Sequence, residues 1–188
     1  MEQPTIALKE WAIAVEVLTA GKTIILLRKG GIREAKFQVE HHRIWLYSTY
    51  EHQKPHLLKP EYAGAVTPVD SGWHPQEVLI KGFADITDVL SINSQAQIDA
   101  LLPYHVWQPE VISDRLKWKP QQPLTVLLLR VYRLIPAQTI AYHSSYGGCK
   151  SWIELLEPLN IDGSIPVMTD SQYQQQVQEI KDLINLQN

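Results

Sequence analysis

The stretch Leu124–Leu134, with the sequence LTVLLLRVYRL, carries the strongest strand pattern in the chain. Five of the six residues between positions 126 and 131 are Val or Leu. A short apolar run that is bounded by a turn residue is typical of a β-strand. The sequence therefore predicts a strand that Pro136 stops, because proline has no backbone N–H to donate to a sheet.

Weaker strand patterns lie nearer the N-terminus. Short runs of β-branched, aromatic and apolar residues predict strands at Thr23–Leu27, Phe37–Val39, Arg43–Tyr47 and Val78–Val89. Gly82 interrupts the last of these runs, which predicts a bend or a break. Residues 48–76 contain four prolines and no long pattern. A loop of this length is usually functional or carries short elements of its own.

Apolar spacing and capping patterns predict four helices. They are expected over residues 6–20, from Ser94-x-x-Gln97 to Leu102, from Ser151-x-x-Glu154 to near Pro158, and after Ser171-x-x-Gln174. Gly21 stands where a left-handed residue would close the first helix. Strands outnumber a regular strand–helix alternation, so the predicted class is α+β. We expect a mixed or barrel-like β-sheet with an N-terminal helix, short inserted helices and a C-terminal helix.

Length and composition favour one globular domain over residues 1–188, with 45% apolar and 20% charged residues. The single cysteine excludes a disulfide framework within the chain and a cysteine-rich zinc site. The sequence has no run of about 18 apolar residues that would span a membrane. It begins Met-Glu-Gln-Pro, without an apolar signal core, so we expect a cytoplasmic protein.

Charge is unevenly distributed along the chain. Residues 21–59 hold eight Lys and Arg but three acidic residues, whereas the rest holds nine and seventeen. A basic segment on an acidic body can attract an anionic partner to one face. The candidate phosphate contacts are Arg28, Lys29, Arg33 and Arg43, and the candidate base-stacking residues are Trp45, Tyr47 and Tyr50. The leading hypothesis is therefore a nucleic-acid or nucleotide binding module, against the plainer alternative of a sheet with one polar face.

A glycine-rich turn around Cys149 is a second candidate site. Gly148, Lys150 and Ser151, at the start of a predicted helix, would offer backbone N–H groups, an ammonium and a hydroxyl to an anion. The turn is not a P-loop, because Cys149 and Ser144 stand where that motif needs glycine. Cys149 is itself a candidate nucleophile, since a helix N-terminus and a lysine favour the thiolate. The plainer alternative is a structural turn with a small, buried cysteine.

Acidic and histidine residues cluster around the predicted strand at Arg43–Tyr47. Glu51 and His52 are candidate catalytic residues, and with His41 they are candidate metal ligands. An acid-x-Lys triplet at Glu34-Ala35-Lys36 partly fits a nuclease pattern that would use Mg²⁺. A metal-dependent enzyme acting on a phosphodiester or nucleotide is therefore the first alternative. The second is a non-enzymatic module for protein partners or a homodimer, because six tryptophans are many for this length.

Four stretches together carry a family pattern. They are Leu8–Ala12 (LKEWA), Ile25–Ile32 (ILLRKGGI), Trp45–Gln53 (WLYSTYEHQ) and Gly148–Trp152 (GCKSW). The chain resembles the bacterial proteins grouped as domain of unknown function 1802 (DUF1802), over nearly its whole length. The resemblance implies a cytosolic bacterial protein, with a suggested link to restriction–modification systems. It brings no assigned activity and no catalytic residues.

Overall fold

The computed structural model describes residues 3–30 and 37–187. Seven strands form one mixed sheet in the order β2-β5-β4-β3-β1-β6, with β7 paired to β5. The strands are β1 (Ile6–Trp11), β2 (Ile25–Arg28), β3 (Arg43–Thr49), β4 (Glu77–Ile92), β5 (Leu124–Ala141), β6 (Trp152–Glu154) and β7 (Ile165–Pro166). Within the described ranges β2 and β6 end the path without pairing to each other, so the sheet is open. The predicted α+β class with a mixed sheet is confirmed.

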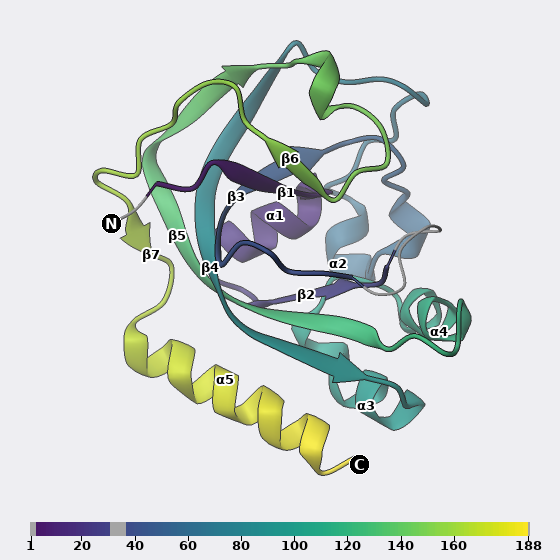
Figure 1. Ribbon diagram of the computed structural model, residues 1–188. Coiled ribbons are helices and arrows are strands. Elements are labelled where there is room, and N and C mark those ends of the chain that lie inside the picture. Colours follow the sequence, from purple (N-terminus) through teal and green to yellow (C-terminus); the bar gives the residue numbers. More distant parts are fainter. Residues whose placement is uncertain (1–2, 31–36, 188) are drawn as a thin grey trace.

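Helices lie around this sheet (Figure 1). They are α1 (Ala12–Thr19), α2 (Pro60–Ala63), α3 (Gln95–Ala100), α4 (Pro109–Lys117) and α5 (Asp170–Asn185), with 3-10 turns η1 (Pro55–Leu57), η2 (Leu102–Tyr104) and η3 (Ser144–Tyr146). The strands curl around α1, and α5 lies along the lower end of the sheet. Across the described ranges, no helix has the length and apolar character to cross a membrane.

The antiparallel pair β4–β5 is the longest strand pairing in the sheet. Gly82 lies at a register shift, as its place in the sequence predicted. A Cβ there would stand 2.3 Å from the Tyr132 carbonyl oxygen, so the close approach of the strands requires glycine. The prediction that Pro136 ends β5 is wrong, because the strand continues to Ala141. Pro136 lies between the pairs Gly82–Arg133 and Ile80–Gln138, in a bulge where no ladder N–H is needed.

The predicted helix over residues 6–20 is wrong in its first half. Ile6–Trp11 forms β1, which pairs in parallel with β3 and antiparallel with β6. Its backbone groups are satisfied by these distant strands, and the helical spacing of Leu8 and Trp11 is a coincidence. The helix begins only at Ala12. Gly21 has φ of +69°, which confirms the left-handed position after its end.

Three further local predictions differ in outcome. The capping box of Ser94 and Gln97 is present and opens α3. No helix follows Ser151, because Trp152–Glu154 forms β6 against β1. Phe37–Val39 lies outside the strands that the structure describes. The error at Ser151 arises because the partner strand β1 is far away in the sequence.

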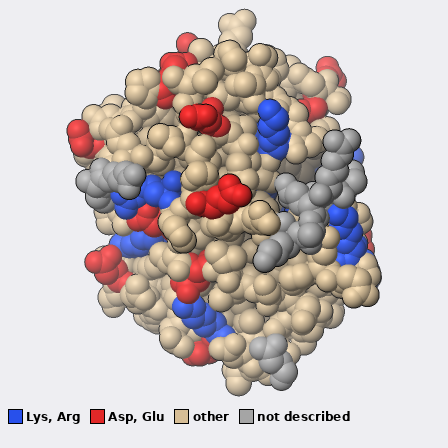
Figure 2. Space-filling model, in the orientation of Figure 1, with Lys and Arg blue, Asp and Glu red and all other residues tan. Residues whose placement is uncertain are grey.

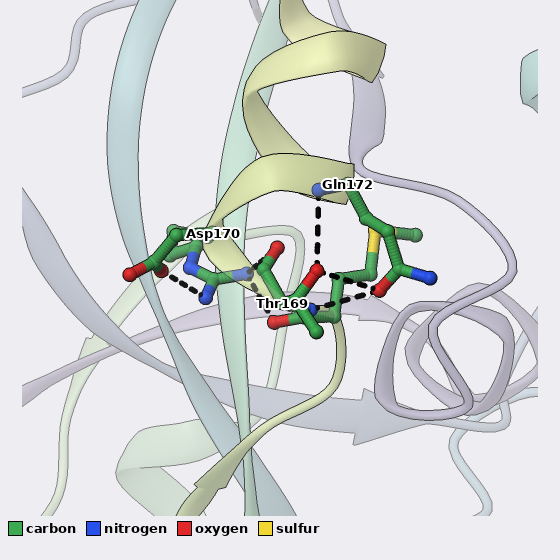
Figure 3. A network of polar contacts seen from close by, with 5 residues as sticks. Thr169, Asp170 and Gln172 are labelled. Carbon is green, nitrogen blue, oxygen red and sulfur yellow. Dashed lines mark hydrogen bonds and ion pairs between the residues drawn. The ribbon is translucent and has the colours of Figure 1, made fainter.

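The cap of the last helix lies two residues before the predicted cap at Ser171. Thr169 and Gln172 form the capping box instead, with the Thr169 hydroxyl accepting from the Gln172 N–H at 3.2 Å (Figure 3). Arg130 fixes this start by donating to the Asp170 carboxylate at 2.6 Å and to the Met168 carbonyl at 2.7 Å. The predicted apolar stripe of the helix is buried as expected.

The two faces of the sheet bury different cores. Ile44 and Leu46 of β3 belong to the larger core, which includes the apolar residues of α1. Trp45 and Tyr47, which alternate with them, belong to a smaller and more aromatic core with Phe83. This alternation is the period of two expected along a strand. The smaller core leads directly to the pocket described next.

Candidate functional site

An open pocket lies beyond the ends of β1 and β3. Four segments line it: Lys9 of β1, residues 47–51 at the end of β3, the loop at 72–75, and Tyr142 with residues 146–148 before β6. Lys9 and Tyr47 are register partners in the parallel pair, so both strands bring their side chains to one place. The volume of about 60 Å³ corresponds to on the order of five water molecules.

Lys9 is the cation of the pocket. Its half-buried Nζ donates to the carbonyl oxygens of Tyr146 at 2.6 Å and Gly148 at 2.8 Å. An ammonium has three N–H donors. Two of them are used in these bonds, and no described residue takes the third, which is left for a ligand. Burial lowers the pKa of Lys9, and the neighbouring Glu51 acts in the opposite direction.

Glu51 is the anion of the pocket. Its Oε1 accepts from the backbone N–H of Gly72 at 2.6 Å and from the Ser71 hydroxyl at 3.2 Å. The Gly72 bond is the main reason that the pKa of Glu51 is lowered, so the carboxylate stays charged at neutral pH. These bonds also join the loop at 71–72 to the end of β3. His52 Nε2 lies 3.3 Å from the same oxygen.

Aromatic rings form most of the remaining wall. They are Tyr47, Tyr50, Trp73, His74, Tyr142 and Tyr146. His74 lies flat on Tyr142, with ring centroids 3.4 Å apart and planes at 11°. Burial raises the pKa of Tyr47, so its hydroxyl stays protonated at neutral pH. A cation, an anion and several rings around a small hollow can hold a flat heterocycle that has polar edges.

The sequence model for DUF1802, described as a domain of unknown function, matches residues 7–179. The chain belongs to this family. No curated protein matches the sequence. Among solved structures, the crystal structure of ASCH from Zymomonas mobilis aligns with 95% of this chain and 94% of its own, at 13% identity and a TM-score of 0.49. The description of DUF1802 assigns no activity, and the residues of the pocket are the observations that bear on function.

The pocket of this DUF1802 chain brings together residues from three candidate sites that the sequence suggested separately. Tyr47 and Tyr50 come from the basic segment, Glu51 from the cluster of acidic and histidine residues, and Gly148 from the turn around Cys149. Cys149 and Lys150 both lie close enough to Lys9 to influence its pKa. The segments are about a hundred residues apart in the sequence, and the strand order β3-β1-β6 brings them together.

The other candidates from the basic segment lie away from the pocket. Arg28 donates to the Glu10 carboxylate at 2.8 Å and to the Ser151 hydroxyl at 2.7 Å. Arg43 holds the Asp85 carboxylate with two bonds, at 2.6 and 2.8 Å. These guanidinium groups therefore already neutralise carboxylates from distant parts of the chain. On the face in Figure 2, basic side chains are scattered among acidic ones and form no continuous patch.

Two further candidates, Trp45 and Lys29, have structural roles of their own. Trp45 is 1% exposed and donates its indole N–H to the Pro4 carbonyl, so it packs in the core. Lys29 donates to the Leu116 carbonyl at 2.8 Å. Arg33 lies outside the described residues.

The turn around Cys149 differs from the predicted anion cradle. A strand, β6, follows it, so no helix N-terminus adds N–H donors. Cys149 is exposed, which contradicts the buried cysteine of the plainer alternative. His143 Nδ1 contacts the Ser145 hydroxyl at 2.8 Å. Lys150 is exposed, and its Nζ lies 3.5 Å from the Ser145 carbonyl, which leaves it able to meet a ligand beside the pocket.

The metal candidates do not gather into a centre. Over residues 3–30 and 37–187, no group of three or more His, Cys, Asp and Glu side chains could hold a metal ion. Glu51 and His52 form a pair, and His41 is exposed. The Glu34-Ala35-Lys36 triplet lies outside the described residues.

The sequence-based candidates include four of the fourteen described residues that line the pocket. They do not include Lys9, Trp73, His74, Tyr142 or Tyr146, which lie in a predicted helix, a long loop and the ends of a strand and turn. The signal that could have found Trp73 and His74 is the long loop at 48–76, which its length marked as functional. Lys9 gave no such signal, because only the parallel pairing of β1 with β3 exposes it to the pocket.

Proposed function

We propose that this protein binds nucleic acid or a nucleotide by taking one unpaired base into the aromatic pocket. The observation that carries the proposal is the combination of Lys9, the Glu51 carboxylate and a wall of aromatic rings around one small, open hollow. Single-stranded nucleic acids are held by stacking of bases on aromatic side chains, at about 1–3 kcal/mol per base.

The two charged groups suit the edge of a base. Lys9 has an N–H to donate to a ring nitrogen or carbonyl oxygen, and Glu51 accepts from an exocyclic amino group. Glu51 Oε1 is already shared by Gly72 and Ser71, so its other oxygen is the acceptor we assign to the ligand. Tyr47, protonated at neutral pH, offers a further hydroxyl.

Phosphate contacts would be few and local. Lys150 is exposed on the turn beside Gly148, where it can reach the backbone of a nucleotide whose base is in the pocket. Arg28 and Arg43 are engaged with carboxylates. We therefore expect a shallow dependence of affinity on salt, since the slope of log K against log salt follows the number of phosphates neutralised.

The test compares strands whose bases are free with strands whose bases are paired. Fluorescence anisotropy is measured with labelled single-stranded DNA, single-stranded RNA and duplex DNA of about eight nucleotides, at about 50 and 200 mM salt. We expect the single strands to bind at least about tenfold more tightly than the duplex, because a paired and stacked base cannot enter the pocket. Equal or stronger binding to duplex, or no binding of single strands at low salt, overturns the proposal.

A further inference from the structure

A second hollow adjoins the pocket. It has a volume of about 400 Å³ and lies between α1, the loop at residues 65–69 and the strand β4. We call it the side groove; Ile13, Gln53, Val66, Val69 and Lys81 line it. It is larger than the pocket and is predominantly apolar.

Two residues line both hollows. Tyr50 and Trp73 belong to the wall of the pocket and to the wall of the side groove. Their rings contact edge to face, with centroids 5.9 Å apart and planes at 87°. Trp73 is 45% exposed, which is high for a residue of its size. The pair therefore separates two neighbouring spaces.

The charges in the side groove cancel. The Lys81 ammonium is paired with the Glu16 carboxylate, and both residues line the groove. The buried Gln53 amide is occupied, because its oxygen accepts from the Ile13 N–H at 3.2 Å and its nitrogen donates to the Tyr50 carbonyl at 3.4 Å. An apolar space without net charge suits a flat, neutral ring better than a phosphate.

We infer that the ligand is a single strand of at least two nucleotides, with one base in the pocket, the adjacent base in the side groove and the Tyr50–Trp73 pair between them. This inference rests on the proposed function and names its substrate class: an oligonucleotide in place of a mononucleotide. Successive bases on aromatic side chains are a general way of holding a single strand without reading a long sequence. The sugar-phosphate link then crosses the rim outside the pair.

The first test uses the unmodified protein and three ligands. Isothermal titration calorimetry compares a nucleoside 5′-monophosphate, the matching dinucleotide, and a dinucleotide in which one sugar carries no base. We expect the complete dinucleotide to bind about tenfold more tightly than the abasic one, which corresponds to about 1.4 kcal/mol and lies within the stacking range for one base. The abasic dinucleotide should bind about as tightly as the monophosphate.

The second test fills the side groove. Ala65 is exposed at its edge, so Ala65→Trp places a bulky ring there without disturbing the core. We expect this variant to lose the tenfold preference for the dinucleotide and to keep its affinity for the monophosphate. The matched control is Ala96→Trp, because Ala96 is an exposed alanine on α3 that lines neither hollow. The control should behave as the unmodified protein.

The outcomes distinguish a failure of the second base site from a failure of the proposed function. Equal affinity for the monophosphate and both dinucleotides overturns the second base site and leaves the proposed function in place. Unchanged dinucleotide preference in Ala65→Trp shows that the second base lies elsewhere and overturns the inference as well. Failure of all three ligands to bind overturns the proposed function together with the inference.

Discussion

His105 makes the stability of this protein depend on pH. The side chain is 5% exposed, and its Nε2 atom is buried without a hydrogen-bond partner among the described residues. Its Nδ1 accepts the Trp107 backbone N–H at 3.3 Å, so the neutral ring carries its proton on Nε2. Burial, reinforced by the positive charges of Lys59 and Arg115, lowers the pKa of His105 to about 3.

The sign and size of the effect follow from this shift. In the unfolded chain His105 takes up a proton below about pH 6.5, whereas in the folded protein it stays neutral until about pH 3. The free energy of unfolding is therefore not reduced by His105 above about pH 6.5. It falls as the pH drops from about 6.5 towards about 3, because the unfolded chain then binds a proton that the folded protein does not. Between about pH 7 and pH 4.5, the loss from this one residue is roughly 2–3 kcal/mol.

The assay is urea unfolding followed by tryptophan fluorescence at the two pH values. The variant His105→Asn keeps an acceptor for the Trp107 N–H and cannot be protonated. We expect the free energy of unfolding of the unmodified protein to fall by roughly 2–3 kcal/mol more than that of the variant. The other six histidines are common to both proteins and cancel in the difference. Equal losses in the two proteins would refute the assignment of a buried neutral His105.

Three further perturbations test the fold and the ligand contacts. Gly82→Ala should cost about 1–3 kcal/mol in thermal or urea unfolding, because its Cβ would meet the Tyr132 carbonyl, whereas Gly64→Ala, with no atom within 4 Å of its Cβ, should change little. Thr169→Ala removes the capping box and should cost about 1 kcal/mol, while Ser171→Ala should be neutral; equal effects would contradict the assigned cap. Lys150→Ala should reduce the slope of log affinity against log salt by about one for single-stranded DNA, and Arg43→Ala, whose guanidinium is held by Asp85, should leave that slope unchanged.

Local sequence signals predicted those parts of the fold that depend on neighbouring residues. The apolar run of β5, the Ser94–Gln97 capping box and the bend at Gly82 are all decided within a few residues, and the structure has them. The strands β1 and β6 were predicted as helices. Their pairing with each other joins residues more than a hundred and forty positions apart, and no local pattern reports that pairing.

The candidate site was predicted in fragments for the same reason. Tyr47, Tyr50, Glu51 and Gly148 were selected from three local patterns, and the fold places all four around one pocket. The count of basic residues over 21–59 pointed to Arg28 and Arg43 because a local count omits distant acids. Glu10 and Asp85 neutralise these residues only once the sheet has formed.

The most direct measurement of the central claim is the affinity of two tryptophan variants for single-stranded DNA. Trp73 and Trp118 are almost equally exposed, at 45% and 44%, but Trp73 alone of the two lines the pocket. We expect Trp73→Ala to weaken binding by about five- to a hundredfold, which corresponds to 1–3 kcal/mol of lost stacking, and Trp118→Ala to bind as the unmodified protein does. Equal affinities of the two variants would show that the bases do not stack in this pocket and would contradict the account.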